Sequence, residues 1–88
     1  MIKVLRAKAV SGHMIRLEFS DGSVGDYDLT ELLSRDTEMV RPLKDQAFFA
    51  DFFPELGALC WRNGFELSGA SLHRRLLERG GLHWAHAA

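Results

Sequence analysis

The residues best suited to chemistry in this sequence are basic and lie near its C-terminal end. His73, Arg74, Arg75 and Arg79 fall in a segment with helical periodicity, and Arg75 and Arg79 stand four residues apart, so they share one face of that helix. Such a face can contact the phosphates of a nucleic acid or an acidic protein surface. Basic residues near a helix C-terminus also stabilise the helix dipole, and this structural role stays open beside the two binding roles.

Arg62 and Trp84 complete the set of residues that we predict to bind a partner. Trp84 follows the predicted helix in a short segment without an evident core to join, and exposed tryptophans are common anchors at protein interfaces. A flexible tail is the competing interpretation of the same segment.

Three carboxylates that are close in sequence, Asp26, Asp28 and Glu31, form one alternative centre. Such groups can share a metal ion or perform acid–base chemistry if their environments separate their pKa values. Asp26 and Asp28, however, are expected on the same face of one strand. Asp28 is also expected to cap the helix that follows, with Glu31 at capping-box spacing. We therefore predict a solvated surface there.

Histidine and cysteine give two further alternatives. His83 and His86 could reach one zinc ion from a helix, but a zinc site needs three or four ligands and only His73 is a further histidine nearby. Cys60 lies in an apolar run with Arg62 as its positive neighbour, so we expect a buried, unreactive thiol. Nucleophile-elbow and phosphate-loop motifs are missing from the sequence. We predict a protein that is not an enzyme and has no cofactor or metal.

The elements that position these residues predict an α+β fold: an antiparallel three-stranded meander plus a second β-hairpin, with two short helices and a C-terminal helix. Ile15, Leu17 and Phe19 alternate with charged residues, as is typical of a half-buried strand. The predicted segments are strands at 2–10, 14–19 and 24–28, a helix at 29–34, a loop at 35–45, a Phe-rich helix at 46–53 ended by Pro54, a hairpin of 56–61 and 65–67 around a type I′ Asn63-Gly64 turn, and a helix from a Ser68 cap to a Gly80 stop.

Composition limits the class of protein. The chain has 88 residues, 47% of them apolar and 26% charged, with a net charge of −1, which predicts one folded domain over residues 1–80 and a flexible tail over 81–88. The clear basic excess of nucleic-acid binders is missing. One cysteine allows no intrachain disulfide, and no apolar run is long enough to span a membrane, so we expect a cytoplasmic, bacterial protein. The small core favours a protein partner or a homodimer.

An ordered set of short motifs is similar to those of the domain-of-unknown-function family 2442, over roughly residues 2–77. The motifs are Phe19-Ser20-Asp21-Gly22, Asp28-Leu29 and Trp61-Arg62-Asn63-Gly64. The family pattern usually has proline where Arg62 stands, and an acidic-proline helix start where this chain has Ser68-Gly69-Ala70-Ser71. The resemblance implies a compact α+β domain that occurs alone, fused to a helix-turn-helix, or beside a small toxin-like protein.

These observations together predict a non-enzymatic protein-interaction or regulatory module, and the resemblance implies an antitoxin-like way of binding a partner. The alternative is a nucleic-acid-associated accessory factor that uses the basic side of the C-terminal helix. In that alternative the binding would weaken steeply with salt, because phosphate contacts release counterions.

Overall fold

The first third of the chain forms the antiparallel meander that its alternating residues predict, in a computed structural model that describes residues 1–84. On the central strand, Ile15, Leu17 and Phe19 are at most 2% exposed and face the core. Arg16 and Glu18 face the other side, where they pair with charged residues of the neighbouring strands. Burial of one face therefore sets the register of the meander.

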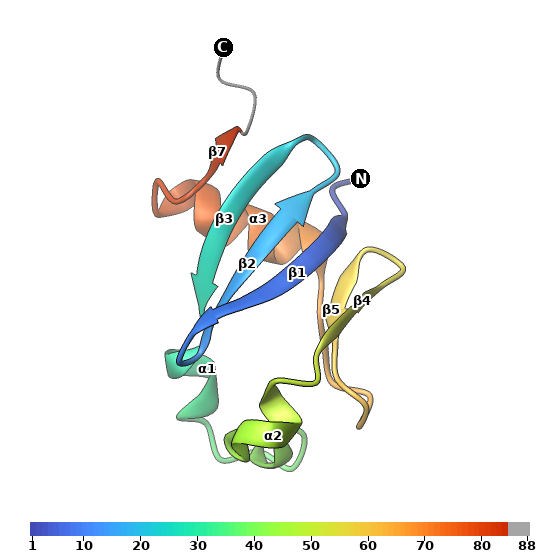
Figure 1. The fold of residues 1–88 in the computed structure, drawn as a ribbon, viewed down its shortest axis with the longest axis vertical. Coiled ribbons are helices and arrows are strands. Elements are labelled where there is room, and N and C mark those ends of the chain that lie inside the picture. The colour runs from blue at the N-terminus through green and yellow to red at the C-terminus, as the bar shows by residue number, and fades with distance from the viewer. Residues whose placement is uncertain (85–88) are drawn as a thin grey trace.

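Residues 1–84 form two antiparallel sheets and three α-helices, which confirms the predicted α+β class (Figure 1). The larger sheet has the strand order β1-β2-β3-β7 and the smaller one β4-β5-β6. α3 lies behind the larger sheet, and the smaller sheet lies beside β1 (Figure 1). The elements are β1 (Val4–Ser11), β2 (Met14–Phe19), β3 (Ser23–Asp28), α1 (Thr30–Leu33), the 3-10 helix η1 (Arg41–Lys44), α2 (Gln46–Phe49), β4 (Phe53–Glu55), β5 (Ala58–Cys60), β6 (Glu66–Leu67), α3 (Gly69–Glu78) and β7 (His83–Trp84).

The Phe-rich helix is shorter than predicted. α2 ends at Phe49, and Phe53 already belongs to strand β4. Pro54 explains the extended conformation of Phe53, because a proline disfavours helical geometry in the residue before it. The predicted loop over 35–45 also contains one short regular element, the 3-10 helix η1.

The turn at Asn63-Gly64 differs from the predicted type I′ geometry. Gly64 alone has a positive φ, 90°, and its N–H donates to the carbonyl of Trp61 at 3.0 Å. This is the pattern of a three-residue loop in which a type I turn is followed by one left-handed residue. Two consecutive left-handed residues, as type I′ requires, occur instead at Leu56 and Gly57, with φ of 50° and 84°, between β4 and β5.

The C-terminal helix begins and ends where the sequence predicts. Ser68 Oγ accepts the N–H of Ser71 at 3.0 Å, and Gly80 has the left-handed φ of 69° that ends a helix. The N–H groups of Gly80 and Gly81 donate to the carbonyls of Leu77 and Leu76, which completes a Schellman motif.

The chain after Gly80 differs from the predicted flexible tail. Leu82 packs against the core, and β7 pairs with the start of β3, Trp84 opposite Ser23 and His83 opposite Val24. Residues 83–84 thus add a fourth strand to the predicted meander, because β3 offers an open edge to which the chain returns. The rest of the predicted tail, residues 85–88, lies outside the described residues.

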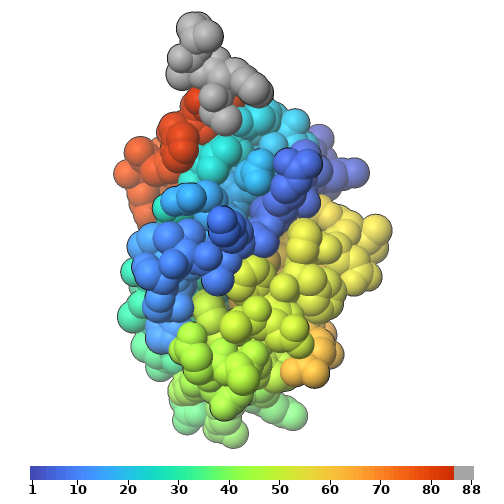
Figure 2. All heavy atoms as spheres, viewed as in Figure 1, coloured from blue at the N-terminus to red at the C-terminus, as the bar shows by residue number. Residues whose placement is uncertain are grey.

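Trp61 belongs to the buried core and lies beside α2. Its side chain is 1% exposed, and its indole N–H donates to the carbonyl of Phe49 at 3.0 Å. In the space-filling view the meander (blue to cyan) and the segment around residues 40–60 (green to yellow) form one continuous face (Figure 2). None of the helices in residues 1–84 is both long and apolar enough to cross a membrane.

Candidate functional site

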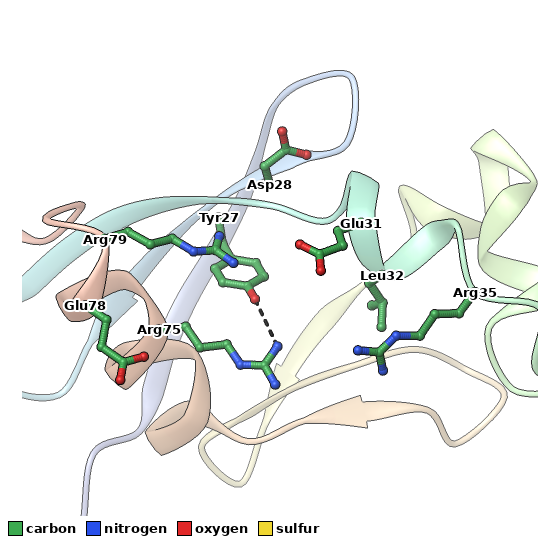
Figure 3. Close-up of a pocket in the computed structure, with 8 residues that line it drawn as sticks. All are labelled: Tyr27, Asp28, Glu31, Leu32, Arg35, Arg75, Glu78 and Arg79. Carbon is green, nitrogen blue, oxygen red and sulfur yellow. Dashed lines mark hydrogen bonds between the residues drawn. The ribbon is translucent and has the colours of Figure 1, made fainter.

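A surface hollow of about 300 Å³ lies between α1, α3 and the end of β3. We call it the Tyr27 hollow, after the residue at its base (Figure 3). Charged side chains from three separate segments line it: β3 supplies one, the helix α1 and its exit supply others, and the second half of α3 supplies the rest. Its lining residues are Tyr27, Asp28, Glu31, Leu32, Arg35, Arg75, Glu78 and Arg79.

Tyr27 holds two arginines of α3 by two different contacts. Arg75 Nη1 donates a hydrogen bond to the Tyr27 hydroxyl oxygen at 3.3 Å, and the Arg79 guanidinium carbon lies 5.1 Å from the centre of the Tyr27 ring. The second contact is a cation–π interaction. Tyr27 can make both because its ring is buried, 5% exposed, while one helical turn separates the two arginines on α3.

Three arginines of the Tyr27 hollow have no close carboxylate. Arg35 follows α1, and its guanidinium points back across the hollow toward α3 (Figure 3). Within residues 1–84, no carboxylate oxygen comes within 4.0 Å of a side-chain nitrogen of Arg35, Arg75 or Arg79. The hydrogen bond with Tyr27 is the largest cause that raises the pKa of Arg75, and the charge of Glu31 adds to it. The guanidinium groups therefore keep donors that can bind an anionic group.

Asp28 has part of the role that the sequence predicts. Its carboxylate accepts the backbone N–H of Thr30 at 2.9 Å and the Thr30 hydroxyl at 2.7 Å, and these bonds lower the pKa of Asp28. The reciprocal capping-box bond with Glu31 does not form among the described residues, because Leu29 occupies the N-cap position of α1. Asp28 thus supports the start of α1 from one residue further back.

Of the three carboxylates that are close in sequence, Asp28 and Glu31 line the Tyr27 hollow and Asp26 does not. Asp26 lies on the outer face of the sheet, where both of its oxygens accept from Arg16, at 2.8 and 3.1 Å. That hydrogen bond lowers the pKa of Asp26. Residues 1–84 contain no group of three or more His, Cys, Asp or Glu side chains arranged to hold a metal ion.

His73 has a bonded place on the other side of α3. Its Nε2 lies 2.9 Å from Asp21 Oδ2, and its ring meets Phe19 edge-on with the centroids 5.1 Å apart. Partial burial alone would raise the pKa of Asp21, but hydrogen bonds from Ser23 and His73 outweigh it and lower that pKa. His73 therefore joins α3 to the β2–β3 turn, and Arg74 beside it is exposed and does not line the Tyr27 hollow.

Arg62 and Trp84 lie apart from the arginines of α3. Arg62 Nε is 2.8 Å from Asp51 Oδ2, and its guanidinium carbon is 5.4 Å from the Phe48 ring centre. Trp84, 48% exposed, lies on β7 at the sheet edge. The structure thus brings together Arg75 and Arg79 from the predicted partner-binding set and distributes the other four residues over three places.

Cys60 and His83 complete the sequence-based candidates. Cys60 is 7% exposed, as predicted, and burial together with the charges of Glu66 and Glu55 raises the pKa of its thiol. His83 lies on the exposed strand β7, and His86, its partner in the predicted His-x-x-His pair, lies outside the described residues.

Four residues of the Tyr27 hollow, Tyr27, Leu32, Arg35 and Glu78, were missed by sequence reasoning, and Tyr27 and Arg35 matter most to its chemistry. Tyr27 is recognisable as an inward-facing strand residue, but its hydroxyl has no visible partner until α3 is placed behind β3. Arg35 falls in a polar segment that predicts only a loop. The signal for both is three-dimensional, because the contact between Tyr27 and Arg75 spans 48 residues of sequence.

Comparison with protein-family models matches residues 4–87 to the family described as "Protein of unknown function (DUF2442)". No curated protein and no solved structure matches the chain. The match extends beyond the span of the motifs in the first 77 residues and includes strand β7. Because it covers nearly the whole sequence, the chain belongs to the DUF2442 family.

Proposed function

We propose that this protein is a non-enzymatic protein-interaction or regulatory module, and that it binds an acidic group of a protein partner in the Tyr27 hollow. One observation carries the proposal: Arg75 and Arg79 are held in place by Tyr27, whereas carboxylates commonly hold surface arginines. Arg35 supplies a third cation from the opposite side of the hollow. An entering carboxylate meets guanidinium groups that are already oriented.

Within residues 1–84, binding in the Tyr27 hollow does not have to break an ion pair of Arg35, Arg75 or Arg79. A guanidinium engaged in an ion pair must give up that pair before it can bind a partner, and the gain is then small. Arg75 keeps most of its N–H donors unused, since one of them bonds to the Tyr27 hydroxyl. A charge-assisted hydrogen bond from such a group contributes about 1.5–3 kcal/mol.

The same hollow argues against the nucleic-acid alternative. Asp28, Glu31 and Glu78 line it together with the three arginines, so its formal charges cancel. A phosphate backbone would meet three carboxylates along with the cations, and like charges at close range repel. A protein segment can place one acidic side chain among the arginines and keep its other groups away from the carboxylates, which favours a protein partner.

The finer parts of the proposal rest on sequence and resemblance. We propose an antitoxin-like mode of regulation because the family resemblance implies pairing with a small toxin-like protein. A cytoplasmic location is part of the proposal, since a single cysteine that forms no intrachain disulfide suits a reducing compartment. We propose no catalytic step, because the carboxylates and the thiol are each engaged or buried apart from one another.

The test is affinity purification from native lysate with three forms of the full chain: wild type, the double variant Arg75→Ala/Arg79→Ala, and the control Arg74→Ala. Arg74 is a neighbouring arginine on α3 that does not line the hollow. We expect one protein to be retained by the wild type and by the control. Removal of two interface arginines costs about 2–4 kcal/mol, so the double variant should bind that protein at least ~30-fold more weakly.

Two outcomes would contradict the proposal. The first is that the chain elutes alone, and the second is that the double variant retains the partner as well as the wild type does. Fluorescence anisotropy with duplex DNA at low and moderate salt tests the alternative directly. Tight binding that falls steeply with salt would favour the nucleic-acid role.

A further inference from the structure

Strand β3 has an edge that is only partly covered. β7 pairs with Ser23 and Val24, the first two residues of β3, and there the pairing stops. The remaining residues, Gly25 to Asp28, have β2 on one side and no strand of the described chain on the other. No loop within residues 1–84 donates a backbone hydrogen bond to them or accepts one from them. Such an edge is a template for one more strand.

The segment Gly81–Leu82, which enters β7, still lies against Gly25. The open part of this edge is therefore Asp26–Asp28, and it leads into the Tyr27 hollow. Side chains alternate between the two faces of β3, so Tyr27 points inward to the hollow while Asp26 points outward to Arg16. Asp28, at the end of the strand, lines the hollow. A residue placed opposite Tyr27 on an added strand would point to the same face as Tyr27. Its side chain would then lie beside Arg75 and Arg79, the two arginines that Tyr27 holds.

We propose that the partner binds as an added β-strand along Asp26–Asp28, on the same edge as β7, and that it places an acidic side chain opposite Tyr27. This inference rests on the proposed function and adds the form in which the partner binds. Backbone hydrogen bonds to the edge supply affinity that is independent of side chains, and the hollow selects the acidic residue.

The charges beside β3 select a foreign segment over a second copy of this chain. Two copies joined antiparallel by their β3 edges would bring Arg75 and Arg79 of each beside those of the other. Like charges that face each other across a strand pair destabilise it. The occupant we propose is therefore an extended segment of another protein that places an acidic residue beside these arginines.

The experiment selects short random peptides displayed on phage against the full wild-type chain and then measures synthetic versions of the selected peptides. Each peptide is made with backbone N-methyl groups on one alternate set of residues and, as a matched control, on the other set. In an added strand only one set of N–H groups points at the edge. We expect methylation of that set to weaken binding at least ~10-fold and methylation of the other set to leave it unchanged.

Amide NMR of the chain reads out the place of binding. We expect the amides of Asp26–Asp28 to shift and to become protected from hydrogen exchange when a selected peptide is added. Arg75→Ala/Arg79→Ala should weaken the peptides whereas Arg74→Ala should not.

Three results would overturn the inference, and they separate it from the proposed function. Peptides that depend on Arg75 and Arg79 but tolerate both methylation patterns would refute strand addition and leave the proposed function standing. Peptides that are insensitive to all of these changes, or a selection that yields none, would contradict both. The same amide shifts caused by raising the concentration of the chain alone would identify a second copy as the occupant.

Discussion

The first residue of α3, Gly69, determines how closely the helix approaches the two sheets. A methyl group at this position would contact the carbonyl oxygen of Gly57 and would lie 2.9 Å from the backbone nitrogen of Val4. Those two atoms form the hydrogen bond, 2.9 Å long, that ties β1 to the β4–β5 turn. We predict that Gly69→Ala destabilises the protein, although alanine is the better helix former.

The magnitude follows from three contributions. Replacement of glycine by alanine in a helix gains up to about 1 kcal/mol from propensity. Weakening the bond between Val4 and Gly57 costs about 0.5–1.5 kcal/mol, and forcing a methyl group against backbone atoms costs about 1–3 kcal/mol more. Backbone atoms cannot rotate away as a side chain would, so we expect a net loss of about 2 kcal/mol.

Urea unfolding followed by tryptophan fluorescence measures this loss. For a domain of this size, a loss of about 2 kcal/mol lowers Tm by roughly 8–16 °C. Gly80→Ala is the matched control, because nothing lies within 4 Å of its added methyl group and only its left-handed φ of 69° is strained. That strain costs about 1 kcal/mol. If Gly69→Ala were as stable as the wild type, that result would contradict the close packing of α3 against the sheets at this residue.

Three further predictions concern other parts of the molecule. Leu56→Asn should raise the free energy of unfolding by about 1 kcal/mol. Residue 56 is 95% exposed, so little packing is lost, and asparagine tolerates its φ of 50° better than leucine does. An unchanged urea midpoint would contradict this prediction. The folded-state pKa of Asp26 is lowered by Arg16, so its stabilisation is present above the unfolded pKa of about 3.9 and lost as pH falls below it. The urea midpoint of the wild type should therefore fall between pH 5 and pH 3, and that of Asp26→Asn should fall less. Cys60 should react with a thiol reagent at pH 8 much more slowly in the native protein than in urea, and equal rates would refute its burial.

Local signals in the sequence predict the elements whose cause is local. The alternation around Leu17 predicts β2, and the serine and glycine at positions 68 and 80 predict both ends of α3, because caps and periodicity act within one turn. β7 could not be predicted in this way. Two residues carry no periodicity, and β7 exists because Leu82 packs on the core and aligns the next residues with β3.

The same distinction applies to the Tyr27 hollow. Spacing along one helix predicts that Arg75 and Arg79 share a face, since four residues make about one turn. Nothing local places Tyr27 or Arg35 beside them, because that requires α3 to lie behind β3 and α1 to follow directly from β3. The turn at Leu56 could not be predicted for a different reason. Leucine disfavours the left-handed conformation that it adopts there, so its residue type gives no sign of a turn.

The aromatic support of the arginines bears on how selective the hollow can be. If carboxylates held Arg75 and Arg79, an incoming acidic group would compete with them, and binding would exchange one ion pair for another with little net gain. Tyr27 instead holds one guanidinium by its hydroxyl and the other by its ring, and both contacts can persist when an anion binds. Asp28, Glu31 and Glu78 keep the net charge of the hollow at zero and so limit attraction to extended polyanions. This combination favours a single, precisely placed carboxylate over a run of phosphates.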